Sequence, residues 1–187
     1  MGPPLAILLL VGVIGILGAL PSIRATAAML PPEAQSFAAI SYVVAGVSAI
    51  VGTFLRWLVY AGVFHALSSV LYDAEEGSFR DTLALTGWGF LPAIGAAIVA
   101  SVAAFVVFSG TTFPSDPAAM AAFARELQNR PELLVANLLG IVFLLWQGLL
   151  WTFAVKHGRG LELREAAITV AIPVALAVLW RGFGVVT

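Results

Sequence analysis

The sequence contains no cysteine, few charged residues and no run of lysine or arginine. Without cysteine there can be no disulfide, no thiolate-bound zinc and no cysteine nucleophile. Only 10% of the residues are charged and the formal net charge is -1, so the basic surface that nucleic-acid binding requires is missing. The His-Glu-x-x-His, Gly-x-Ser-x-Gly and phosphate-binding glycine motifs are missing as well. We therefore expect no enzyme activity, no cofactor, no metal site and no nucleic-acid partner.

Hydrophobic residues are abundant, because they make up 61% of the chain and the mean hydropathy is +1.03. Soluble domains carry about 25% charged residues, so this chain has too few charges to cover a soluble globule. The composition predicts an all-α, polytopic integral membrane protein. We expect a single transmembrane domain over residues 1–187, built as a bundle of five transmembrane helices.

The apolar stretches and the connectors between them place the five spans. The run Leu5–Leu20 is short for a bilayer that needs about 20 residues, so we extend it to Ser22. A connector ending at Leu30-Pro31-Pro32-Glu33 follows. The next run, Ala39–Leu71, would form about 50 Å of helix, which predicts one span that leaves the bilayer near the aromatic residues Trp57 and Tyr60. The expected spans are 5–22, 39–60 with the helix continuing to 71, 79–108, 133–153 and 165–183.

Two charged connectors lie between these spans: an acidic one, Asp73–Asp81, and a basic one, Lys156–Arg164. Ser78 followed by Asp81 forms a variant of the capping box and predicts a helix that starts at Phe79. If both connectors lie at the same membrane face, their opposite charges predict an inner-face cluster. The alternative is that both connectors are solvated and the basic one meets anionic lipid head groups. The candidate cluster consists of Asp73, Glu75, Glu76, Arg80, Asp81, Lys156, Arg159 and Arg164.

The third span carries a one-sided pattern of small residues. Small residues let membrane helices approach closely, so this side is expected to be the main packing surface of the helix. Pro92 lies outside the pattern and is expected to kink the helix. After this span, Asp116 and Pro117 predict the start of a short amphipathic helix on the membrane surface, between the third and fourth spans. Thr82 and Thr86 lie on the same side of the helix. The small-residue stripe that follows them consists of Gly89, Ala93, Ala96, Ala97, Ala100 and Ala104.

Four polar side chains fall within the apolar stretches: Arg56, His65, Asn137 and Gln147. Arg56 is interpreted as an interfacial anchor or as a buried charge that faces an acidic partner. His65 is interpreted as a packing residue or as a ligand or proton-relay residue. Each amide either bonds a neighbouring helix or lines a substrate path.

An odd number of spans puts the two termini on opposite sides of the membrane. The lysine and arginine residues outside the spans divide equally between the two sides. The short basic connector Lys156–Arg164 favours a cytoplasmic N-terminus and an extracytoplasmic C-terminus in the cell membrane.

Two stretches of this chain resemble a known family. Glu76-Gly77-Ser78-Phe79-Arg80-Asp81-Thr82-Leu83, followed by Gly87-Trp88-Gly89-Phe90-Leu91-Pro92, is similar to the third-helix region of the Yip-one (Ypt-interacting protein) domain family. Leu144–Trp151, followed by Ala154–Leu161 and Ala166-Ala167, resembles its fourth helix, basic connector and fifth helix. The resemblance implies five spans and a cytoplasmic N-terminus. Eukaryotic members of the family are linked to vesicle trafficking through a cytoplasmic N-terminal region and an Asp-Leu-Tyr-Gly-Pro motif. In this chain Gly-Pro does not follow Tyr72-Asp73, and only four residues precede the first span. The resemblance therefore implies a prokaryotic-type member without these two trafficking segments.

Two classes of function remain open. The first is a non-enzymatic membrane scaffold or interaction protein whose partners are membrane lipids, further copies of the chain or other membrane proteins. The alternative is a transporter or channel-like carrier of small molecules or ions that uses the polar faces of the second and fourth spans. A connected cavity that reaches Arg56, Asn137 or Gln147 favours transport, and a dry, closely packed bundle favours the scaffold. The physiological process, the substrate and the oligomeric state are not predicted.

Overall fold

A computed structural model of the chain describes all residues except 1, 29–34, 110, 112–113, 115 and 187. The described part is all-helical, which confirms the expected fold class of a polytopic membrane bundle. The described residues contain five helices long and apolar enough to cross a membrane. The seven helices are α1 Gly2–Ala28, α2 Gln35–Tyr72, α3 Phe79–Trp88, α4 Leu91–Phe108, α5 Pro117–Gln128, α6 Pro131–Arg159 and α7 Leu163–Val186.

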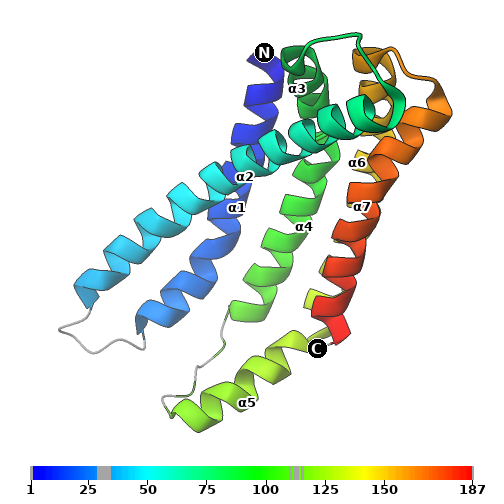
Figure 1. Cartoon of the computed structure of the whole chain (residues 1–187). Helices are drawn as coiled ribbons and strands as arrows, with labels where there is room; N and C mark the ends of the chain where they lie inside the picture. Colours follow the sequence, from blue (N-terminus) through cyan, green and yellow to red (C-terminus); the bar gives the residue numbers. More distant parts are fainter. Residues whose placement is uncertain (1, 29–34, 110, 112–113, 115, 187) are drawn as a thin grey trace.

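The long helices run between two ends of the bundle (Figure 1). The N-terminus, α3 and both charged connectors lie at the upper end, whereas α5 and the C-terminus lie at the lower end. The two termini therefore lie at opposite ends, as five crossings require. The residues Leu30-Pro31-Pro32-Glu33, at the end of the first expected connector, lie outside the described residues.

Contacts between helices place α4 in the middle of the bundle, because it packs mainly against α1 and α6. At the crossing with α1, the Ser101 hydroxyl donates to the carbonyl of Ile14 at 3.1 Å and lies directly over Gly18. At the crossing with α6, Gly95 leaves room for the ring of Phe143. The outer surface is apolar, and Trp180 is 81% exposed, as expected for side chains that face lipid.

The expected helix 79–108 is divided in two. Ser78 caps α3 and forms the capping box with Asp81, which confirms the predicted start. The helix then stops at Trp88, and a turn at Gly89 and Phe90 precedes α4, in which Pro92 occupies the first turn. Proline is favoured in a first turn because its missing N–H is not needed there, so the chain breaks at this point and does not merely kink.

The interface aromatics expected at the end of the second span lie elsewhere. Trp57 is only 7% exposed and donates its indole N–H to the carbonyl of Leu83 at 2.8 Å. Tyr60 packs inside the bundle against Trp151, with ring centroids 4.5 Å apart. The expectation of an aromatic belt at these positions is therefore wrong, because both rings fill the space around the break between α3 and α4.

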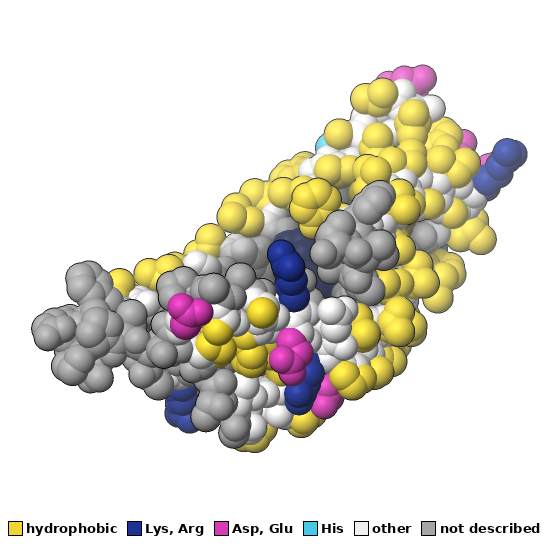
Figure 2. All heavy atoms as spheres, turned by 90° about the horizontal axis from the view of Figure 1, so that it is seen from below, with side chains coloured by type: hydrophobic (Ala, Val, Ile, Leu, Met, Phe, Trp, Pro, Cys, Tyr) yellow, Lys and Arg dark blue, Asp and Glu magenta, His cyan; other side chains and the backbone are white. Residues whose placement is uncertain are grey.

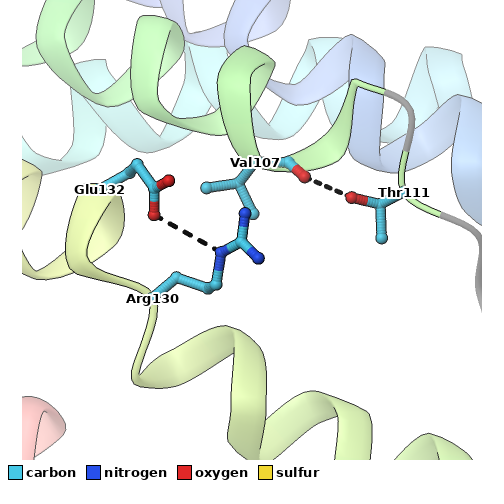
Figure 3. A network of polar contacts seen from close by, with 4 residues as sticks. All are labelled: Val107, Thr111, Arg130 and Glu132. Atoms are coloured by element: carbon cyan, nitrogen blue, oxygen red, sulfur yellow. Dashed lines mark hydrogen bonds and ion pairs between the residues drawn. The ribbon is translucent and has the colours of Figure 1, made fainter.

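The predicted short helix is confirmed as α5. Asp116 is its N-cap and accepts a hydrogen bond from the backbone N–H of Ala119 at 2.9 Å. At the junction with α6, Arg130 and Glu132 form an ion pair at 3.5 Å, and Figure 3 shows the Arg130 side chain reaching toward Val107 near the end of α4. This half-exposed pair contributes only about 0–1 kcal/mol, so it orients the junction more than it stabilises the fold.

Candidate functional site

The two charged connectors meet at Arg159, in the last turn of α6. Arg159 is only 3% exposed, although it carries a permanent charge. Its Nη1 donates to the carbonyls of Glu76 and Gly77, both at 2.6 Å, and its Nη2 donates to the carbonyl of Ala74. The guanidinium group of Arg159 therefore binds the backbone of the acidic connector.

Arg159 also binds the end of α2. Its Nε donates to the hydroxyl of Ser68 at 2.9 Å and its Nη2 donates to the hydroxyl of Ser69 at 2.8 Å. Arg159 therefore donates both to hydroxyls near the end of α2 and to carbonyls of the connector that follows α2. Among the described residues, no carboxylate pairs with Arg159.

Two glycines allow the connectors to touch. Gly77 has a φ of 71°, in the left-handed region, and its Cα lies against the carbonyl of Gly158. Gly160, also with positive φ, ends α6 and lies beneath the side chain of Glu76. A side chain at either position would separate the connectors, so glycine at both positions is what lets Arg159 reach its acceptors.

The predicted inner-face cluster is thus brought to one end of the molecule, but its contacts are not those expected from charge. The Glu76 backbone accepts from Arg159, while the Glu76 carboxylate lies over Gly160. Asp81 is used in the capping box, where its carboxylate accepts from the backbone N–H of Ser78 at 3.0 Å. The remaining members, Asp73, Glu75, Arg80 and Arg164, are exposed, and Lys156 is half-buried. A functional role for the cluster stays a prediction.

His65 lies just inside this end of the bundle. Its Nδ1 is 3.2 Å from the hydroxyl of Thr82, and its ring meets the edge of Phe79 at 5.6 Å between centroids. These contacts pack α2 against α3. Among the described residues, no group of three or more His, Asp or Glu side chains gathers in a way that could hold a metal ion.

Below this end, four aromatic rings close the centre of the bundle. Trp151 is fully buried, and its ring centroid lies 5.5 Å from that of Phe64 and 5.4 Å from that of Phe90. Tyr60 completes the group. The indole N–H of Trp151 donates to the carbonyl of Thr86 at 2.9 Å, and Gly89 leaves room for the ring. We call these four residues, Tyr60, Phe64, Phe90 and Trp151, the aromatic layer.

A cavity of about 400 Å³ lies beneath the aromatic layer. Three of the four predicted intramembrane polar residues, Arg56, Asn137 and Gln147, line it. The structure adds Arg181, from the last part of α7, as a fourth polar lining residue. Arg181 falls within the expected span 165–183, and nothing local to that span indicates that its side chain turns inward. Figure 2, which views the molecule from below, shows Lys or Arg side chains near the middle of this face, with Asp or Glu side chains close by.

The small-residue stripe divides between packing and cavity. Gly89 and Ala93 are buried at the upper end of the stripe, where Gly89 contacts Trp151. Ala96, Ala97 and Ala100 line the cavity together with Ala93, and Ala104 is half-buried. The stripe as the main packing surface stays a prediction, since four of its members line the cavity.

Comparison with known proteins agrees with this architecture. The Yip1 domain family matches residues 1–181 of the chain. An uncharacterized protein, MJ0794, of Methanocaldococcus jannaschii is 38% identical over 71 residues, which is 38% of this chain and 49% of the relative. The chain thus matches about half the length of that curated relative. No solved structure matches the chain. Because the family match covers nearly all of the five-span bundle, the chain belongs to the Yip1 domain family.

Proposed function

We propose that the chain is a non-enzymatic membrane scaffold or interaction protein of the Yip type. The observation that carries the proposal is the junction at Arg159, where one side chain holds both connectors in a fixed arrangement. A rigid polar surface at one end of a membrane bundle suits the docking of a partner, because little conformational entropy is lost when the partner binds.

The exposed side chains of the two connectors form what we call the connector surface. Its exposed carboxylates outnumber its exposed guanidinium groups by five to two. An acidic surface repels anionic lipid head groups, so we infer that its partner is a basic segment of a membrane protein, either another protein or a second copy of this chain. The connector surface comprises Asp73, Glu75, Glu76, Asp81 and Glu162 together with Arg80 and Arg164.

We place the connector surface on the cytoplasmic side of the cell membrane, with the C-terminus outside. The short basic connector supports this orientation through the positive-inside rule. Family membership supports it as well, since the resemblance implies a cytoplasmic N-terminus.

The carrier alternative has one observation in its support, which is the cavity lined by Arg56, Asn137 and Gln147. The α2 and α6 walls of the cavity meet the aromatic layer within about one helical turn, because Tyr60 follows Arg56, and Trp151 follows Gln147, by four positions. The fully buried rings of Phe64 and Phe90 fill the layer. Because this layer separates the cavity from the connectors, we keep the interaction role as our proposal.

Photo-crosslinking in native membranes tests the interaction role. A photoreactive phenylalanine analogue at Glu75 or Arg80 should give a discrete protein adduct, whereas the same analogue at lipid-facing Val142 should give none. An adduct at twice the mass of the 19.5 kDa chain identifies a second copy, and any other mass identifies a different partner. Replacing the neighbouring Glu76 with lysine should weaken the adduct, and the matched change Glu126→Lys on α5 should not. If positions 75 and 80 behave like position 142, the proposal is wrong.

A further inference from the structure

The cavity beneath the aromatic layer presents two guanidinium groups and two side-chain amides, but no carboxylate. We propose that this cavity is a binding site for an oxyanion of the phosphate class, carried by the head group of a membrane lipid or present as free phosphate. The site is separate from the connector surface, which lies at the other end of the bundle.

The positive charge of the cavity is not compensated by acidic side chains. Among the described residues, no acidic side chain lies within ion-pair distance of Arg56 or Arg181. The two guanidinium groups instead line the same cavity. Arginine cannot lose its proton in a protein, and an unpaired charge within a bilayer is costly. A bound anion would offset both charges at once.

The hydrogen-bond donors of the two arginines are held in place and available to a ligand. The guanidinium group of Arg56 lies over the ring of Phe90, 5.1 Å from its centroid, which positions the group by a cation–π contact and uses none of its N–H donors. The Nη1 of Arg181 lies against Gly140, where any side chain would occupy its place. Planar guanidinium groups suit the oxygens of phosphate because they offer parallel N–H donors.

The amides add to this donor set. Gln147 is only 5% exposed, yet its amide makes one long hydrogen bond, from Nε2 to the carbonyl of Phe143 at 3.5 Å. Asn137 lines the same cavity about three turns nearer the lower end of α6. Both amides can therefore turn a donor toward a ligand without breaking a strong internal contact.

The walls favour a ligand that is only partly polar. Ala96, Ala97 and Ala100 leave the volume open because their side chains are small, and Val11 and Leu133 add further apolar surface. An apolar wall beside the polar lining residues suits a lipid head group, in which a phosphate is joined to a glycerol and its acyl chains. Free phosphate would bind the same polar side chains, and water would fill the remaining space.

Binding can be measured on the full chain purified in a neutral detergent. The thermal midpoint should be followed while inorganic phosphate or phosphatidic acid is added, with sodium chloride of equal ionic strength and uncharged diacylglycerol as the respective references. At least one phosphate source should raise the midpoint in a saturable manner. Arg56→Gln and Arg181→Gln should each raise the Kd about tenfold or more, because each removes a charge-assisted hydrogen bond. Arg125→Gln, on exposed α5, should leave the Kd unchanged.

A second pair of variants keeps both arginines in place. Ala97→Leu should fill the cavity and weaken binding, while Ala171→Leu, the same change on the lipid-facing side of α7, should not. A response to phosphatidic acid alone assigns the ligand to a lipid head group. A response to inorganic phosphate alone assigns it to the free anion, and either result supports the site. The site is refuted if neither source shifts the midpoint, or if Ala97→Leu and the double variant Arg56→Gln/Arg181→Gln bind as the wild type does.

Discussion

Trp151 donates its indole N–H to the backbone carbonyl of Thr86 at 2.9 Å, across the contact between α6 and α3. The same ring lies against Gly89, at the point where the polypeptide turns from α3 into α4. One side chain of α6 therefore fills the gap at the break and satisfies a carbonyl that the shortened helix leaves with few partners.

Replacing Trp151 with phenylalanine should destabilise the bundle by about 1–3 kcal/mol, because it removes a buried hydrogen bond and leaves a void beside Gly89. Unfolding in detergent, followed by circular dichroism, measures the change. Trp146→Phe is the matched control on the same helix, since Trp146 is 51% exposed, and it should change stability by less than about 0.5 kcal/mol. Equal effects of the two substitutions would contradict the role given to Trp151.

Arg159→Lys should destabilise the protein by about 2–3 kcal/mol although it retains the charge. A lysine ammonium is a point donor and cannot reach hydroxyls on α2 and carbonyls of the connector at the same time, as the guanidinium group does. Arg164→Lys, in the same connector but exposed, is the control and should be neutral. Equal stability of Arg159→Lys and the wild type would show that the charge alone matters.

Gly77→Ala should cost at least about 1–2 kcal/mol, because alanine is strained at positive φ and its Cβ would collide with the carbonyl of Gly158. Gly62→Ala is the matched control. Gly62 lies within α2 with no atom near the position of a Cβ, so alanine there should be neutral or stabilising by about 0.5–1 kcal/mol. The same loss in both variants would mean that the contact between the connectors is not close.

The capping box of α3 should make stability depend on pH. Hydrogen bonds from the Ser78 hydroxyl, and then from its backbone N–H, lower the pKa of the Asp81 carboxyl below its ordinary value of 3.8. A lowered pKa means that the contribution is fully present above the ordinary value and is lost as the pH falls through the lowered pKa. The difference in thermal midpoint between wild type and Asp81→Asn should therefore be constant near neutral pH and shrink in strong acid. A difference that does not vary with pH would count against the capping role of the carboxylate.

The absence of native cysteine allows the proposed orientation to be tested directly. Single cysteines at Ser78, in the acidic connector, and at Asn129, at the end of α5, should be exposed at opposite ends of the bundle. In intact cells an impermeant thiol reagent should label position 129, and position 78 should react only after the membrane is opened. The reverse pattern would place the connector surface outside.

Local features of the chain were predictable from sequence because they depend on residues only a few positions apart. Apolar stretches predicted the five-span bundle, and the polar caps predicted the starts of α3 at Ser78 and of α5 at Asp116. Pro92 indicated a disturbance in the third span, but its neighbours along the chain do not reveal whether the helix bends or breaks. The hydrogen bond and the ring that fill the gap at the break come from Trp151, which is distant in sequence.

The candidate sites depended on contacts that only the tertiary structure decides. Sequence reasoning paired Arg159 with carboxylates because side-chain charge is visible in a sequence, whereas its acceptors are backbone carbonyls and serine hydroxyls that only the folded connector presents. Arg56 and Arg181 likewise line one cavity because α2 packs beside α7. Hydropathy and capping determine which segments become membrane helices, but the side on which each polar group finds its partner is set by how those helices pack.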